Sequence, residues 1–182
     1  MPPNKAILKE QVNELSKKEL VEIVIKLSAK KPNYDFLLIN YLDKDGGEQS
    51  LYDEVIEDIE ALCNKEYKGR TIQHQQVKRL KACTKKMTEF TASVKNKKLE
   101  ADLMIFLLDI QFAQPSKVFG ARFSGYDYKV GLLLKKLITL VTKKMHPDYL
   151  IDYEDKINVF LEKLQHTSNH IQTISDLPQS IE

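Results

Sequence analysis

The segment 116–128 holds the side chains best suited to binding a ligand. It interleaves cationic residues, which attract anions, with aromatic residues, which stack on planar groups, and its glycines allow close approach to the backbone. The candidate binding residues are Lys117, Phe119, Arg122, Phe123, Tyr126 and Tyr128. They could hold an anion, a peptide carboxylate or a base; alternatively, the aromatic side chains close one end of the core and the charges are solvated. Gly120 and Gly125 do not form a phosphate-binding loop, because no Lys-Ser/Thr pair follows them.

A row of basic residues is a second candidate. Lys78, Lys81 and Lys85 are three and four residues apart in a predicted helix, so they share one face. Arg79 and Lys86 form a parallel row beside them. These side chains could bind the phosphates of a nucleic acid, with an affinity that falls as the salt concentration rises.

The distribution of charge along the chain supports a competing interpretation of this row. Residues 35–60 include nine acidic residues and one basic residue, whereas residues 65–98 include eleven basic residues and two acidic ones. We expect the two helices in these segments to pair as a hairpin, with carboxylates of the first flanking lysines of the second. Exposed ion pairs contribute only about 0–1 kcal/mol each, but they determine which faces meet. The net charge of +2 does not by itself imply a polyanionic partner.

Glu162, His166 and His170 are spaced four residues apart and would lie on one face of the last predicted helix. Two histidines at positions i and i+4 can share a metal ion, but the Glu of an HExxH motif is missing and a third ligand is conjectural. No Ser/His/Asp or Cys/His arrangement indicates catalysis. We therefore expect no metal and no cofactor, and an enzyme is kept only as an alternative to a non-enzymatic role.

Cys63 and Cys83 are the only cysteines. Both fall on the apolar faces of predicted helices, which indicates two buried thiols. A disulfide between them would require the two helices to pack antiparallel, and no other feature of the sequence indicates an oxidising compartment.

Hydrophobic periodicity predicts eight helices and no strand. The first two helices are expected to turn their apolar side chains inward. Ser16 and Glu19 form a capping box for the second helix, Asn33 is expected to cap the third after Pro32, and Ser50 to begin the fourth. The expected ranges are 4–15, 17–29, 34–42, 51–66, 72–94, 99–113, 127–145 and 148–174.

The segment 99–113 is the most apolar of these, with eleven hydrophobic residues out of fifteen, and is predicted to be the central helix. The chain has 182 residues, of which 42% are hydrophobic, and few glycines or prolines. We predict an all-α fold of antiparallel helix pairs, either a helical bundle or a short α-solenoid of the HEAT/armadillo kind. Residues 1–174 are expected to form a single domain, and residues 175–182 a flexible tail.

Two stretches resemble known helical proteins. Between Ser16 and Pro32, a capping serine, Lys-Lys-Glu-Leu and a closing proline resemble the helical hairpins of repeat-like scaffold proteins. The run Ala101-Asp-Leu-Met-Ile-Phe, with the Phe/Gly/Tyr-Asp loop and amphipathic helix that follow, resembles a family of uncharacterised bacterial all-helical proteins over about residues 5–165. The resemblance implies an all-helical fold and brings no catalytic motif with it.

These features together predict a non-enzymatic helical interaction or scaffold module that binds another protein through an exposed groove or a charged face. The alternatives are a nucleic-acid-associated protein that uses the basic row, and a small-ligand binder or enzyme centred on segment 116–128. No membrane segment is expected, because the longest apolar run, Leu103–Leu108, has six residues against the roughly 20 of a membrane span. The N-terminus has no signal-peptide features, so a cytoplasmic location is predicted.

Overall fold

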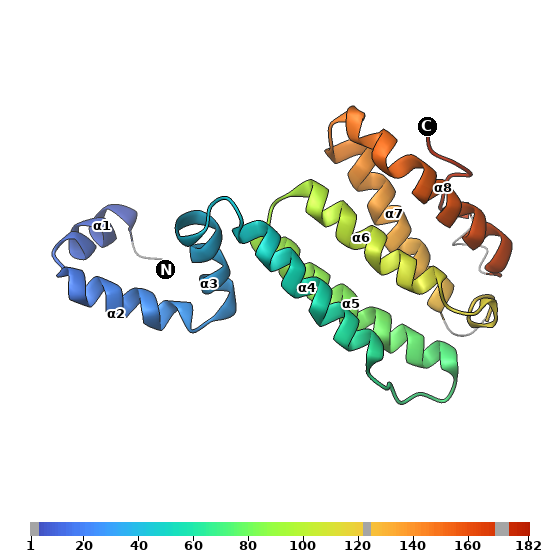
Figure 1. Cartoon of the computed structure of the whole chain (residues 1–182), viewed down its shortest axis with the longest axis horizontal. Helices are drawn as coiled ribbons and strands as arrows, with labels where there is room; N and C mark the ends of the chain where they lie inside the picture. The colour runs from blue at the N-terminus through green and yellow to red at the C-terminus, as the bar shows by residue number, and fades with distance from the viewer. Residues whose placement is uncertain (1–3, 122–124, 170–174) are drawn as a thin grey trace. The chain divides into compact units, whose positions relative to one another are not determined.

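A computed structural model of the chain describes residues 4–121, 125–169 and 175–182. Over these residues it consists of α-helices joined by turns and loops, without any strand, which confirms the predicted all-α fold (Figure 1). The helices are α1 (Lys5–Asn13), α2 (Lys17–Ser28), α3 (Lys31–Leu37), α4 (Gly47–Asn64), α5 (Ile72–Ser93), α6 (Lys97–Phe112), α7 (Tyr126–Lys144) and α8 (Leu150–Thr167). A π-helical turn, η1 (Leu38–Leu42), follows α3, and the short 3-10 helices η2 (Ser116–Val118) and η3 (Pro147–Tyr149) precede α7 and α8.

The chain divides into two compact units, Met1–Glu48 and Gln49–Glu182, called the N-terminal unit and the C-terminal unit below. The first ends at the beginning of α4, and the second contains the rest of α4 and the helices that follow. That residues 1–174 behave as a single domain stays a prediction, which the unfolding of the whole chain can test.

In the N-terminal unit, local capping determines where the helices begin. The Ser16 hydroxyl accepts a hydrogen bond from the Glu19 backbone N–H (3.3 Å), and the Glu19 carboxylate accepts one from the Ser16 N–H (2.8 Å), which is the predicted capping box. These hydrogen bonds lower the pKa of Glu19. Helix α2 then packs against α3 within this unit.

Two helix starts differ from the prediction. Pro32 lies in the first turn of α3, because a proline there loses no helical hydrogen bond, and Asn33 is inside the helix, with its side-chain amide donating to the Leu27 carbonyl (2.7 Å). Helix α4 begins at Gly47 rather than near Ser50. Before it, the Asp43 carboxylate accepts a hydrogen bond from the Gly46 N–H (2.9 Å) and so turns the chain into the helix four residues earlier.

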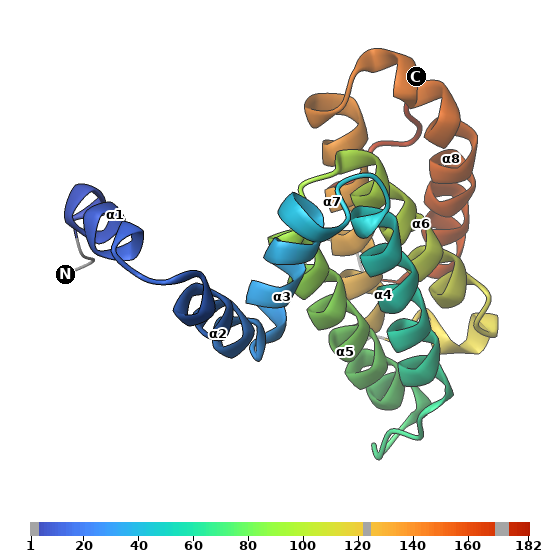
Figure 2. The same cartoon turned by 60° about the vertical axis from the view of Figure 1, so that its left-hand side comes forward.

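In the C-terminal unit, α6 contacts α5, α7 and α8, in agreement with the prediction that the most apolar helix is central (Figure 2). The contacts of α6 with α8 advance in the same direction along both helices, from Asp102–Tyr153 to Asp109–Lys156, so these two helices are parallel. The core side chains of α6 that are buried are Ala101, Leu103, Met104, Leu107 and Leu108.

The polar positions of α6 are also paired. The Tyr153 hydroxyl donates to the Asp102 carboxylate (2.7 Å), and Lys156 contacts Asp109 (2.9 Å). Glu100 is buried and contacts the ammonium groups of Lys97 (2.7 Å) on α6 and Lys136 (3.3 Å) on α7. Burial acts to raise the pKa of Glu100, but the hydrogen bonds and charges of the two lysines outweigh it and lower that pKa.

The C-terminal segment 175–182 lies against α8. The Asn158 side chain donates to the Ile181 carbonyl (3.1 Å) and accepts from the Ile181 N–H (2.9 Å), while the Ile181 side chain is buried. Helix α8 itself ends at Thr167, seven residues before the predicted end at 174; residues 170–174 lie outside the described residues. The flexibility of the tail stays a prediction. A flexible tail would have to lose the hydrogen bonds between Asn158 and Ile181.

Candidate functional site

The described part of segment 116–128 is packed into the core. Phe119 and Tyr126 are buried, and their ring centroids are 5.2 Å apart. Phe112 stacks on Phe119 at 5.6 Å and on Phe160 of α8 at 4.9 Å, which makes a continuous aromatic cluster at this end of the unit. Phe119 and Tyr126 are therefore covered by neighbouring side chains.

The remaining candidates in this segment are dispersed. Lys117 is exposed, and its backbone carbonyl accepts a hydrogen bond from Gln73 of α5 (3.0 Å). Tyr128 is half-buried in the first turn of α7. Arg122 and Phe123 lie outside the described residues.

Polar contacts hold this segment in place. The Tyr126 hydroxyl donates to Gln111 (3.1 Å), and the Gly120 N–H donates to the Asp127 carboxylate (2.8 Å). Burial, followed by the charge of Asp127, raises the pKa of Tyr126, so its hydroxyl stays protonated and acts as a hydrogen-bond donor. Gly120 has a φ of 78°, and a Cβ there would approach the Asn169 amide nitrogen to 3.0 Å, which explains the glycine. These hydrogen bonds connect the described part of the segment to α6 and α7.

The five residues of the basic row do not form one surface. Lys78, Lys81 and Lys85 are exposed on α5, as their spacing predicts. Lys86 instead contacts Asp58 of α4 (2.7 Å), which is one of the pairs expected for a hairpin of opposite charge. Arg79 is half-buried, so three residues of the row face solvent.

The Glu162/His166 pair does not form a metal site in the described structure. His166 Nδ1 lies 2.8 Å from the backbone carbonyl of Glu162, so this histidine contacts the main chain of its own helix. His170, the third candidate, lies outside the described residues. Within the ranges that the structure describes, no cluster of three His, Cys, Asp or Glu side chains could hold a metal ion.

The structure reveals a candidate that sequence reasoning missed, on helices α1 and α2. These helices are described throughout their length and contain no buried residue. Their large apolar side chains are exposed, with Ile25 at 66% of its accessible surface. We call this set the N-terminal apolar surface: Ile7, Leu8, Val12, Val21, Ile23, Val24, Ile25 and Leu27.

A signal for this surface is present in the sequence. Six of the eight residues from Leu20 to Leu27 are apolar. At 100° per residue they cover an arc of roughly 200°, wider than the stripe of about 100° that a helix needs to pack on one neighbour. An arc of this width indicates a helix that is contacted from more than one side.

Comparisons of the chain with protein-family models, with curated proteins and with solved structures each find no match. Within the described ranges, none of the helices combines the length and the apolar character that crossing a membrane requires.

Proposed function

We propose that this chain is a non-enzymatic interaction module whose N-terminal unit binds an amphipathic helix of another protein. The observation that carries the proposal is the N-terminal apolar surface, because its eight large apolar side chains are all exposed on two short helices, and large exposed apolar surfaces mark interaction sites. The role agrees with the interaction or scaffold function that the sequence predicts.

The length of the helices supports the need for a partner. Helix α1 has 9 residues and α2 has 12, and isolated helices shorter than about 12–15 residues are marginal in water. In proteins such helices are stabilised by burying an apolar face, and these two bury none of their residues. Binding a partner would supply the missing burial, at roughly 25 cal/mol for each Å² of apolar surface covered.

The shape and charge of the surface indicate the chemistry of the partner. The exposed apolar side chains of α2 recur from Val21 to Leu27, through the C-terminal half of the helix, which fits a second helix laid along it with apolar side chains every three or four residues. Residues 1–48 include eight lysines and eight acidic residues, so the unit has no net charge to select a strongly charged partner. Apolar contact is therefore the main source of affinity.

Site-specific photocrosslinking tests the proposal. A photoreactive p-benzoylphenylalanine would replace Ile25 in the full chain, and a matched chain would carry it in place of Ile151, which is 79% exposed on α8 of the C-terminal unit. Irradiation in cells should give a discrete adduct with another protein from position 25 and none from position 151.

Three outcomes would overturn the proposed function. One is equal crosslinking from both positions, which would indicate random encounters. Another is an adduct with the mass of two copies of this chain, which would assign the surface to self-association. The third is crosslinking from position 25 only to residues of the same chain.

A second candidate function, binding of nucleic acid, is favoured by the exposed lysines of α5. Lys78, Lys81 and Lys85 present three cations on one face. The ammonium of Lys78 donates to the Lys68 carbonyl (2.6 Å) and that of Lys85 lies 3.8 Å from the Glu89 carboxylate, so phosphates would have to compete with these contacts. Three phosphate contacts predict a slope of about −2.7 for log K against log salt concentration with duplex DNA. Binding without salt dependence, or binding that survives replacement of all three lysines by glutamine, would exclude this candidate.

A further inference from the structure

The two cysteines face one another across the hairpin of α4 and α5. The Sγ atoms of Cys63 and Cys83 are 3.9 Å apart, and neither cysteine is in a disulfide. The distance is within reach of a thiol hydrogen bond and longer than the S–S bond of about 2.05 Å, so the pair is in contact and reduced.

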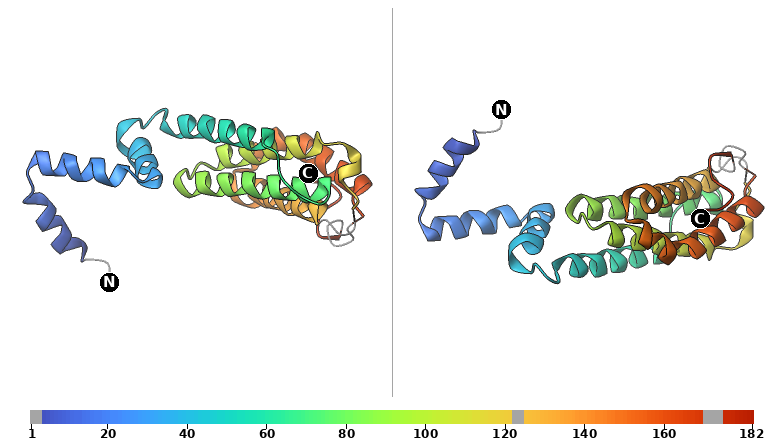
Figure 3. Two further views of the ribbon diagram at one scale, coloured as in Figure 1. Left: turned by 90° about the horizontal axis from the view of Figure 1, so that it is seen from below. Right: turned by 90° about the horizontal axis from the view of Figure 1, so that it is seen from above.

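The hairpin geometry brings the two thiols together. Tyr52 of α4 packs against Phe90 of α5 with ring centroids 6.0 Å apart, and Asp58 contacts Lys86 one and a half turns further along α4. Residue numbers rise along α4 as they fall along α5, so the helices are antiparallel, as a Cys63–Cys83 contact requires. In both views of Figure 3 the axes of α4 (teal) and α5 (green) lie in nearly the same direction.

The two thiols differ in access to solvent. Cys83 is fully buried, at 0% exposure, whereas Cys63 is half-buried near the end of α4. A small oxidant that arrives from solvent therefore meets Cys63 before Cys83.

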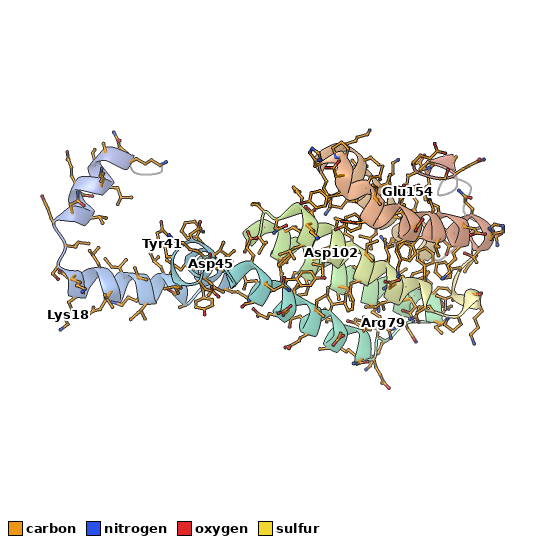
Figure 4. All side chains as sticks on the ribbon, turned by 45° about the horizontal axis from the view of Figure 1, so that its top comes forward. Lys18, Tyr41, Asp45, Arg79, Asp102 and Glu154 are labelled. Atoms are coloured by element: carbon orange, nitrogen blue, oxygen red, sulfur yellow. The ribbon has the colours of Figure 1, made fainter. Side chains whose placement is uncertain are left out.

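Arg79 supplies a positive charge beside the pair. Arg79, labelled in Figure 4, lies one turn before Cys83 on α5. Its Nε atom is buried without a hydrogen-bond partner among the described residues. The hydroxyl of Tyr67, in the loop between the helices, is also buried without a hydrogen-bond partner among the described residues. A guanidinium that is not fully hydrogen-bonded is available to stabilise a thiolate nearby.

The acidity of the two thiols is consistent with this arrangement. The hydrogen bond from Cys83, aided by the charge of Arg79 and opposed by burial and by Glu60, lowers the pKa of Cys63 to about 7. The same hydrogen bond, together with burial, raises the pKa of Cys83. Near neutral pH Cys63 therefore ionises more readily than Cys83, which keeps its proton.

We propose that Cys63 and Cys83 form a redox site in which Cys63 reacts with hydroperoxides and Cys83 then closes a reversible disulfide between α4 and α5. This site rests on observations in the C-terminal unit and is independent of the protein-binding function of the N-terminal unit.

The chemistry balances with a hydroperoxide as the oxidant. The Cys63 thiolate attacks the distal oxygen of ROOH; an S–O bond forms, the O–O bond breaks, and the alkoxide takes a proton and leaves as ROH. The Cys83 sulfur then attacks the Cys63 sulfur; the S–S bond forms, the S–O bond breaks, and the oxygen leaves as water with the Cys83 proton. Two thiols are oxidised, and one hydroperoxide is reduced to an alcohol and water. A dithiol reductant reverses the change.

Mass spectrometry of the full chain tests the reaction. Reduced protein would receive a small excess of hydrogen peroxide, then N-ethylmaleimide to block the remaining thiols. We expect a monomer that has lost two hydrogens, carries no maleimide, and yields one peptide pair joined through Cys63 and Cys83; dithiothreitol should restore both thiols. Full maleimide labelling, a disulfide between chains, or oxidation of Cys63 to the sulfinic acid without linkage would each overturn the proposal.

Variants assign the order of attack. In Cys83→Ala, a sulfenic acid should accumulate on Cys63 and be trapped by dimedone, while in Cys63→Ala the thiol of Cys83 should stay unreacted because it is buried. If Cys83 in Cys63→Ala is oxidised as fast as in the wild type, then Cys63 is not the thiol that reacts first with the hydroperoxide. Cys63→Ala changes a half-buried position, so this comparison holds even where Cys83→Ala does not fold.

The pH dependence of alkylation at Cys63 tests whether Arg79 acts as a positioning residue. The rate of iodoacetamide alkylation of Cys63 against pH should have a midpoint near 7 in the wild type, move to higher pH in Arg79→Gln, and return towards 7 in Arg79→Lys. A wild-type midpoint at the value of about 8.5 that is typical of a free cysteine would overturn the assignment. A purely structural role for Arg79 would leave the midpoint unchanged.

Discussion

Leu103 of α6 and Ile25 of α2 are aliphatic side chains in amphipathic helices, yet Leu103 exposes 0% of its surface and Ile25 exposes 66%. The same contrast holds across the two units that contain them. The C-terminal unit buries apolar side chains from α4 through α8, whereas α1 and α2 bury none.

The difference between the units teaches that amphipathic character and burial are separate properties. A pattern of apolar residues shows that one face of a helix avoids water, but it does not identify what covers that face. In the C-terminal unit, the neighbouring helices of the same chain cover it. In the N-terminal unit we propose that another protein does so, and substitutions in the two units should therefore have opposite effects on stability and on binding.

The largest effect is expected for Leu103→Asp. The substitution places a carboxylate among fully buried apolar side chains, which costs several kcal/mol, against the roughly 5–15 kcal/mol that stabilises a typical domain. We expect the C-terminal unit to lose its cooperative unfolding transition in circular dichroism. Leu132→Asp on α7, at a position that is 44% exposed, is the matched control and should keep the transition. A soluble Leu103→Asp protein with wild-type melting would contradict the assignment of α6 to the core.

An intermediate effect is expected for Glu100→Gln. The amide cannot pair as an anion with Lys97 and Lys136, so we expect a loss of about 1–2 kcal/mol in the free energy of unfolding near neutral pH. Lys135→Gln, which removes an exposed contact with Asp176, is the control and should change stability by less than about 1 kcal/mol. Urea denaturation measures both.

The pH dependence of the Glu100→Gln effect follows from the lowered pKa of Glu100. The carboxylate favours the folded state fully at pH values above its unfolded pKa of about 4.3, and this advantage is lost as the pH falls through the lower folded pKa. The difference in stability between wild type and Glu100→Gln should therefore be constant at neutral pH and shrink in acid. A difference that grows in acid would show that Glu100 does not act as an ion pair.

Much of the C-terminal unit could be predicted from its sequence, because its helices are covered by one another. The periodicity of α5, α6 and α7 located these helices to within about three residues, and the opposite charges of α4 and α5 anticipated the Asp58–Lys86 contact. The antiparallel pairing that a Cys63–Cys83 contact needs was left open in the sequence, since spacing along a chain does not determine which faces meet.

The sites were harder to predict than the helices. The mixture of cationic and aromatic residues at Lys117, Phe119 and Tyr126 is the same whether the rings bind a ligand or fill a core. The sequence does not show that Phe119 stacks on Phe112, which the structure does. For α2, the periodicity predicted an inward apolar face, and the structure shows that face exposed. No local pattern reveals a missing neighbour, apart from the width of the apolar arc.

The smallest effect on stability is expected for Ile25→Lys. This variant is also the sharpest test of the contrast between the two units. Because this side chain is exposed and covered by nothing within α2, its replacement should change the free energy of unfolding by no more than about 0.5 kcal/mol, and a lysine in the last turn is compatible with the helix. Binding of the protein that crosslinks at position 25 should nevertheless weaken by about tenfold or more, since a charge would enter an apolar interface. Ile151→Lys, at an even more exposed position in the C-terminal unit, should leave that binding unchanged. If Ile25→Lys instead lowers the melting temperature as a core substitution does, then α2 is already covered within its own chain, and the distinction between the two units does not hold.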